Sequence, residues 1–168
     1  MRFTLIDRIV DLQPGTRITA VKNLSLAEEY LADHFPGFPV LPGVFMLEAM
    51  TQAAAWLLRV SDDFAHSMVV LKEARNVKYN QFVEPGQTLT VTAEALEAPS
   101  GHSAGQEVPF KAAGMVGGEQ AVSARLVLSR YNLADTDPSR DLTDQIIKHK
   151  MRELLALLHR PPVSANRA

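Results

Sequence analysis

The chain has 168 residues, of which 46% are hydrophobic and 21% are charged, which is enough for one sizeable core and little more. Its net charge of -2 gives no electrostatic basis for binding nucleic acid or an anionic membrane, and the absence of cysteine excludes disulfides, thiolate catalysis and metal sites built on sulfur. The sequence has no signal-peptide pattern and no membrane-length apolar run, so we expect a soluble, cytoplasmic protein.

The first predicted elements are a strand and a short helix. Residues 16–22 alternate between polar and apolar side chains, which is the period of a half-buried strand. Ser25 and Glu28 then have the spacing of a capping box, in which two side chains satisfy free backbone donors at a helix start. We therefore expect a short helix from Ser25 towards Leu31, just before His34.

Residues 34–43 form a segment with proline at positions 36, 39 and 42. Proline fixes its own φ and restricts the residue before it, so we expect a stiff, extended loop. Proline at every third position is also typical of polyproline ligands. Such ligands stay exposed, whereas this segment runs into an apolar helix, and we interpret it as part of the rim of the core.

Residues 43–59 are predicted to form a helix that is apolar on nearly every side and roughly 25 Å long. Glu48 and Gln52 interrupt it, one turn apart on the same face. A carboxylate in an apolar helix is costly unless it is paired or protonated. Glu48 is therefore either a catalytic group or a buried carboxylate that Gln52 satisfies, and the two interpretations are compatible.

The second half is predicted to be β-structure, in residues 68–83, 88–93, 110–116 and 121–128. The first two of these segments are separated by a turn at Pro85-Gly86, and we expect them to pair as antiparallel neighbours, the first with a bulge. The last two flank Gly117 and Gly118, which supply the positive φ of a tight hairpin. Residues 99–105 are predicted to be a flexible loop.

The C-terminal part is predicted to be a flexible linker at residues 135–140 and a helix at residues 141–159. An apolar stripe along this helix suits docking on the outside of a sheet, and its members are Leu142, Ile146, Leu154 and Leu158. We therefore expect a domain at residues 1–134 and a linker with a helical extension at residues 135–168. Deletion of the residues after Asp137 should leave the chemistry largely intact but lower the stability or change the oligomer.

One long buried helix enclosed by an antiparallel sheet is the plan of an α+β hot-dog fold, with an extra C-terminal helix in this chain. Residues 34–52 also carry a resemblance. A histidine, a Pro-Gly-Val turn, a glutamate and a glutamine occur here in the order and spacing of the FabZ-type (3R)-hydroxyacyl-[acyl-carrier-protein] dehydratases. The matching segment reads His34-Phe35-Pro36-Gly37-Phe38-Pro39-Val40-Leu41-Pro42-Gly43-Val44, continued by Glu48-Ala49-Met50-Thr51-Gln52.

This resemblance implies a hydro-lyase that removes water from 3-hydroxyacyl thioesters, carried on acyl carrier protein or coenzyme A, in fatty acid or related lipid biosynthesis. His34 and Glu48 would be the catalytic residues, and Gly43, Val44 and Gln52 the substrate-binding ones. The resemblance also implies no metal and no cofactor. It further implies a homodimer or higher homo-oligomer, in which the histidine of one subunit lies against the glutamate of another.

The residue types suit this chemistry. Dehydration needs a base for the proton at C2, an acid for the departing hydroxyl, and donors for the charge on the thioester oxygen. Histidine exchanges protons near neutral pH, and His34 lies in a rigid loop. Gly43 has no Cβ, so a ligand can approach the N–H groups at the start of the helix, where the dipole favours negative charge.

Two other classes are alternatives: a hot-dog acyl thioesterase and a non-catalytic acyl-binding or assembly protein. The histidine–proline segment favours the dehydratase over both. Dehydratases that also isomerise the double bond usually have aspartate at the position of Glu48, so glutamate favours dehydration alone. The chain departs from the family at Asp33, where glycine is usual, and lacks the usual Pro-His-Arg-Tyr-Pro-Phe segment near its N-terminus.

Overall fold

The computed structural model of the protein describes residues 3–97 and 105–160, and within these ranges the chain forms six strands and two α-helices. Their order is β1 (Arg8–Gln13), β2 (Arg17–Asn23), α1 (Gly43–Ser61), β3 (Met68–Tyr79), β4 (Thr88–Ala95), β5 (Glu107–Val116), β6 (Glu119–Tyr131) and α2 (Asp141–Leu158). Short 3-10 helices lie at Glu29–Ala32, Leu133–Asp135 and Pro138–Arg140.

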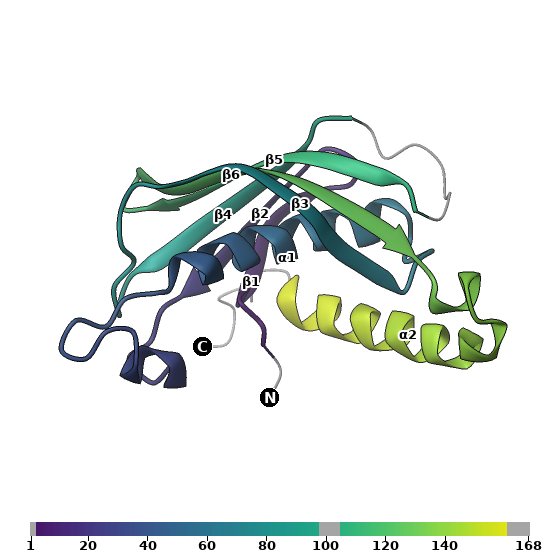
Figure 1. Cartoon of the computed structure of the whole chain (residues 1–168), viewed down its shortest axis with the longest axis horizontal. Helices are drawn as coiled ribbons and strands as arrows, with labels where there is room; N and C mark the ends of the chain where they lie inside the picture. Colours follow the sequence, from purple (N-terminus) through teal and green to yellow (C-terminus); the bar gives the residue numbers. More distant parts are fainter. Residues whose placement is uncertain (1–2, 98–104, 161–168) are drawn as a thin grey trace, which may run out of the picture.

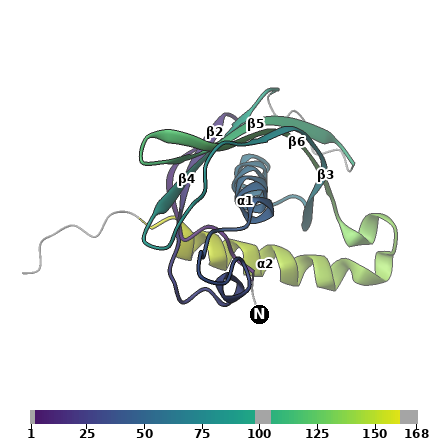
Figure 2. The same cartoon turned by 60° about the vertical axis from the view of Figure 1, so that its left-hand side comes forward.

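One antiparallel sheet, with the strand order β1-β2-β4-β5-β6-β3, curves around α1 (Figure 1, Figure 2). Burial alternates along the strands: in β2, Ile18 and Ala20 are fully buried, whereas Thr19 and Val21 are partly exposed. This is the pattern of a strand with one face on the core. The structure confirms the expected α+β hot-dog fold, with α2 as the additional C-terminal helix.

The inner face of α1 is built from small residues. Ala49, Ala53 and Ala54 are fully buried, and their small side chains let the strands approach the helix axis closely. The larger Met50 and Leu57 are also fully buried and fill the remaining space under the sheet. The expected burial of the helix on most of its sides is therefore confirmed.

The predicted pairing of the segments at residues 68–83 and 88–93 is wrong. β3 pairs with β6, whereas β4 lies between β2 and β5. The polar and apolar alternation of a strand determines which face is buried, but it does not identify the neighbouring strand.

The expected hairpin is confirmed, because Gly117 and Gly118 have φ values of 59° and 88° between β5 and β6. The expected bulge in β3 is present as shifts in its register with β6.

The capping box predicted at Ser25 and Glu28 does not form, and the helix there is a single 3-10 turn, Glu29–Ala32. Glu28 instead accepts a hydrogen bond of 2.6 Å from Nζ of Lys22, whose side chain is almost completely buried. A buried ammonium group requires an anionic partner, and Glu28 provides it for Lys22. The carboxylate of Glu28 is therefore not available to cap the helix.

α2 lies on the concave side of the sheet, beside the face of α1 that the strands leave uncovered (Figure 1, Figure 2). The expected docking on the outside of the sheet is therefore wrong. Of the predicted apolar stripe, Leu154 and Leu158 contact the core, but Leu142 and Ile146 are 67% and 45% exposed.

Buried Asp144 sets the rotation of the first half of α2. Its carboxylate accepts hydrogen bonds from Oγ of Ser67 and from the backbone N–H groups of Leu133 and Ala134, the last two at 2.9 Å. A carboxylate is stable in the interior only when its oxygens are hydrogen-bonded. These three donors therefore turn Asp144 inward, which leaves Leu142 on the opposite side of the helix.

The segment at residues 135–140 is held by hydrogen bonds and is not the flexible linker that we expected. Asp135 accepts a bond of 2.8 Å from the N–H of Asn132, and Asp137 accepts one of 3.1 Å from the N–H of Ser139.

The division of the chain at residue 134 stays a prediction. Apart from Gly105, the loop predicted at residues 99–105 lies outside the described residues. In the described ranges, neither helix has the length and apolar character needed to cross a bilayer.

Candidate active site

The loop before α1 fixes the imidazole of His34. Its Nδ1 atom lies 3.1 Å from the carbonyl oxygen of Val40, and the N–H of Val40 donates a 3.0 Å bond to the carbonyl of His34. The loop is closed further by two backbone bonds between Phe35 and Phe38. A carbonyl oxygen only accepts hydrogen bonds, so Nδ1 carries a hydrogen and Nε2 is the basic atom of neutral His34.

His34 and Gly43 line the same cavity, which has a volume of about 410 Å³. Tyr79 and Phe82 form part of its aromatic wall. A Cβ atom at position 43 would lie 3.1 Å from the ring of Tyr79, which is tighter than ordinary van der Waals contact, so glycine suits this close approach of helix and ring. Gly43 and Val44 begin α1, where helix geometry leaves N–H groups without an intrahelical acceptor and the dipole favours an anion. The cavity thus combines a base with donors for an oxyanion.

Glu48 lies on α1 outside this cavity and is held by Gln52. One amide hydrogen of Gln52 is donated to Oε1 of Glu48 at 3.0 Å, and the other to the carbonyl of Phe3 at 3.1 Å. The amide oxygen accepts a 2.9 Å bond from the N–H of Leu5. Both amide hydrogens of Gln52 are thus used. This geometry fits a role for Gln52 in positioning Glu48, because no amide hydrogen is left to donate to the substrate.

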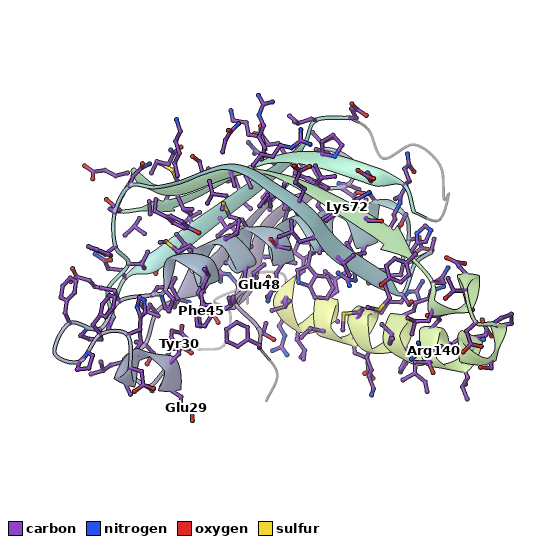
Figure 3. The ribbon with its side chains drawn as sticks, viewed as in Figure 1. Glu29, Tyr30, Phe45, Glu48, Lys72 and Arg140 are labelled. Carbon is purple, nitrogen blue, oxygen red and sulfur yellow. The ribbon has the colours of Figure 1, made fainter. Side chains whose placement is uncertain are left out.

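Glu48 faces a groove of about 540 Å³ between α1 and α2. Figure 3 shows Glu48 on the side of α1 that points away from the sheet, near the C-terminal part of α2. The residues of α1 that line the groove are Glu48, Thr51, Gln52, Ala55, Trp56 and Arg59. The opposite wall comes from Lys150, Met151 and Leu154 of α2, with Val69 of β3 and the segment at Phe3 and Thr4 completing it.

Within one chain, the structure brings His34 together with Gly43, and Glu48 together with Gln52, but places the two pairs in different cavities. The chain therefore carries an imidazole beside the start of α1 in one place and an oriented carboxylate in another. This is a hot-dog protein whose histidine and glutamate are side chains of the kind that serve general acid–base chemistry, with a helix terminus where the dipole favours negative charge.

Comparison with known proteins identifies the family. The model of the FabA-like domain matches residues 1–125, and the chain belongs to this family. The 3-hydroxyacyl-[acyl-carrier-protein] dehydratase FabZ of Symbiobacterium thermophilum is 34% identical over 138 residues, which are 82% of this chain and 94% of that enzyme. FabZ of Variovorax paradoxus is 39% identical over 128 residues, 74% of this chain and 82% of the relative. The resemblance to FabZ-type dehydratases is confirmed.

Solved structures support the fold. The dehydratase heterocomplex ApeI:P from Xenorhabdus doucetiae contains a chain that aligns with a TM-score of 0.62 at 19% identity, covering 85% of this chain and 89% of that one. A Streptococcus mutans protein bound to acetyl CoA aligns with a TM-score of 0.56 at 13% identity, covering 77% of this chain and 91% of that one. At these identities the likeness concerns the fold alone.

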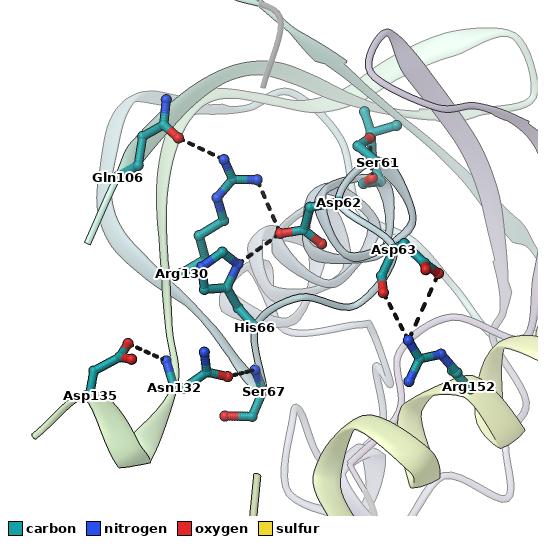
Figure 4. Close-up of polar contacts among 11 residues, drawn as sticks. Ser61, Asp62, Asp63, His66, Ser67, Gln106, Arg130, Asn132, Asp135 and Arg152 are labelled. Carbon is teal, nitrogen blue, oxygen red and sulfur yellow. Dashed lines mark hydrogen bonds and ion pairs between the residues drawn. The ribbon is translucent and has the colours of Figure 1, made fainter. Parts of the chain in front are cut away.

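The α2 residues in the groove at Glu48 were not predictable from the sequence, because no local pattern indicates which helix lies opposite. A buried polar cluster at the end of α1 was not predicted either (Figure 4). Asp62 accepts bonds from Nδ1 of His66 at 2.9 Å and from Arg130 at 3.1 Å, and Arg130 also donates to Gln106 at 2.7 Å. This cluster joins the end of α1 to β6. In the part of the chain that the structure describes, no group of side chains has the composition of a metal site.

Proposed function

We propose that this chain dehydrates (3R)-hydroxyacyl thioesters, carried on acyl carrier protein, to trans-2-enoyl thioesters in fatty acid or related lipid biosynthesis. Family membership supports the reaction class, and the observation that carries the assignment of residues is the shared cavity of His34 and Gly43. A cytoplasmic location, expected from the sequence, is part of the proposal.

In the proposed reaction, the thioester oxygen accepts hydrogen bonds from the N–H groups of Gly43 and Val44, which stabilise the enolate-like charge. Nε2 of His34 takes the proton from C2, and the electron pair of the C2–H bond forms the C2=C3 double bond. The C3–O bond breaks, and Glu48 donates its proton to the departing hydroxyl, which leaves as water. One proton then passes from His34 to Glu48 to restore both groups, so the reaction needs no cofactor.

We further propose that a second copy of the chain completes the site, with His34 of one subunit facing Glu48 of the other. Two features support this. The pair lies in different cavities within one chain. The 12-residue strand β3 is at the edge of the sheet, where unpaired backbone groups favour association with another chain.

The test is to incubate the purified protein with 3-hydroxyacyl thioesters of graded length on acyl carrier protein and on coenzyme A, and to follow enoyl formation. The proposal expects enoyl product, with higher kcat/KM on the carrier protein. Release of free thiol without enoyl product would instead establish the thioesterase alternative. Binding of acyl thioesters without either product would establish the non-catalytic one.

A further inference from the structure

We propose that α2 is part of the substrate site: it forms one wall of the groove that receives the acyl chain, and Met151 and Leu154 determine which chain lengths fit. The inference rests on the proposed dehydratase function and extends it to a helix outside the residues that the FabA-like domain model matches.

The groove begins at the catalytic carboxylate and leads away from it. It starts at Glu48 and Gln52, continues past Trp56, and reaches Arg59 near the end of α1. At 1.5 Å per residue, the path from Glu48 to Arg59 follows the helix for roughly 16 Å. α2 forms the opposite side of this path. An acyl chain that extends along the groove from a thioester reacting at Glu48 therefore runs between the two helices.

The walls have the chemistry of a hydrocarbon site. The middle of the groove is apolar and is lined by Ala55, Trp56, Val69, Met151 and Leu154. Methionine is flexible and polarizable, so it adapts to chains of different shape. A pocket of this volume that combines apolar walls with polar groups that orient the ligand is typical of small-molecule sites.

Two cations lie along the same groove and limit its apolar length. Arg59 lines it from α1 and Lys150 from α2. Burial lowers the pKa of Arg59 to about 10, opposed by the charge of Asp62, so the guanidinium stays charged at neutral pH. A methyl terminus next to a charged, partly desolvated guanidinium gains nothing from burial, so the favourable region for hydrocarbon is finite.

α2 is held firmly enough to act as a wall. Asp144 anchors its first half through the backbone of Leu133 and Ala134. In its second half, Arg152 donates a 2.8 Å bond to the carbonyl of Asp63, and its guanidinium lies 4.8 Å from the centre of the Phe64 ring. These contacts fix α2 against the turn that ends α1.

The first test changes the width of the groove. Met151→Phe and Leu154→Phe should reduce kcat/KM for 3-hydroxyhexadecanoyl relative to 3-hydroxybutyryl carrier protein by about tenfold or more, a typical penalty for a pocket that no longer fits. Met151→Ala should raise kcat/KM for the long-chain substrate relative to kcat/KM for the short-chain one. The matched control is Ile146→Phe on the exposed face of α2, which should keep the wild-type ratio. If the folded Met151 and Leu154 variants all keep the wild-type ratio, the inference is wrong.

A second measurement uses the natural chain and needs no variant. Trp56, the only tryptophan of the protein, lines the groove. A long-chain acyl coenzyme A brominated near the end of its chain should quench Trp56 fluorescence, whereas a brominated butyryl thioester should quench it much less. Equal quenching by both, or none at concentrations that inhibit turnover, would overturn the inference. Absence of turnover with every chain length would instead count against the dehydratase proposal, independently of the quenching result.

Discussion

The amide of Gln52 donates a 3.0 Å hydrogen bond to Oε1 of Glu48 from one helical turn further along α1, and the same nitrogen donates to the carbonyl of Phe3. The carboxylate is thus oriented by a side chain that is itself fixed to the backbone of the N-terminal segment, also through the N–H of Leu5. Gln52 therefore connects the position of the proposed acid to the packing of the segment that leads into β1.

The first prediction follows from this connection. Gln52→Leu should lower kcat by about 10–100-fold, the size expected when a group that orients a catalytic residue is lost. KM should change much less, because Gln52 has no amide hydrogen left for the substrate. Gln52→Glu is the matched comparison. It keeps the shape of the side chain but replaces the amide that donates to Glu48 with a second carboxylate, so the pH dependence of kcat should shift. A rise in KM at constant kcat would contradict the positioning role.

The second prediction concerns the proposed catalytic pair, His34 and Glu48. His34→Ala and Glu48→Gln should each reduce dehydration by about 10²–10⁴-fold, the usual contribution of a general acid or base. Glu48→Gln keeps the hydrogen-bonding shape of the side chain, so its melting temperature should stay close to that of the wild type. Thermal melts separate loss of chemistry from loss of fold. Losses below about threefold in both folded variants would refute the assignment of the pair.

The third prediction concerns pH and the docking of α2. Burial alone would raise the pKa of Asp144, but hydrogen bonds from Ser67 and from the N–H groups of Ala134 and Leu133, with the charge of Lys148, outweigh it and lower that pKa. The folded-state value thus lies below the ordinary value of 3.8. The carboxylate therefore contributes its full stability above that value and loses the contribution as pH falls through the folded-state pKa.

Asp144→Asn should accordingly destabilise the protein by about 1–3 kcal/mol at neutral pH, because charged hydrogen bonds to a buried group are lost. Melts of the wild type and the variant should converge as the pH falls through the folded-state pKa of Asp144, which lies below 3.8, because the wild-type carboxylate then becomes protonated. Asp141→Asn, an exposed change in the same turn, serves as the control. A difference between Asp144→Asn and wild type that does not depend on pH would contradict the role of the charge.

The fourth prediction revises the expected effect of removing the C-terminal helix. Because α2 lines the groove at Glu48, a chain ending at Asp137 should be less stable and should also lose its preference among acyl chain lengths. Turnover of the shortest substrate should fall less than turnover of the longest. Activity across the length series, melting and light scattering would be measured together. A truncated enzyme with the full-length selectivity would show that α2 only covers α1.

Local features of the sequence were sufficient to predict much of this structure. The apolar run after Gly43 predicted α1, and the pair Gly117 and Gly118 predicted the β5–β6 hairpin, because each depends on residues close together in the chain. The pairing of β3 with β6 depends on distant segments and was not predictable from alternation. The rotation of α2 was also missed, because buried Asp144 is satisfied by donors far away in sequence and not by an apolar pattern.

The candidate site was predicted as far as it depends on short motifs. His34, Gly43 and Glu48 could be singled out from their spacing and from the resemblance to the FabZ-type family. Their separation into two cavities within one chain was not apparent from the sequence, because it depends on how the loop before α1 folds over its start. The contribution of Met151 to the groove depends on the packing of α2 and had no sequence signal.

The central claim is that His34 of one subunit and Glu48 of another form one dehydratase site, and subunit mixing tests it most directly. His34→Ala and Glu48→Gln chains, each inactive alone, would be mixed in equal amounts under conditions of subunit exchange. If exchange is random, half of the dimers are mixed and each has one intact site, so activity should recover to about a quarter of the wild-type value. Mixed dimers that form, as mass spectrometry would show, and stay inactive would contradict the claim.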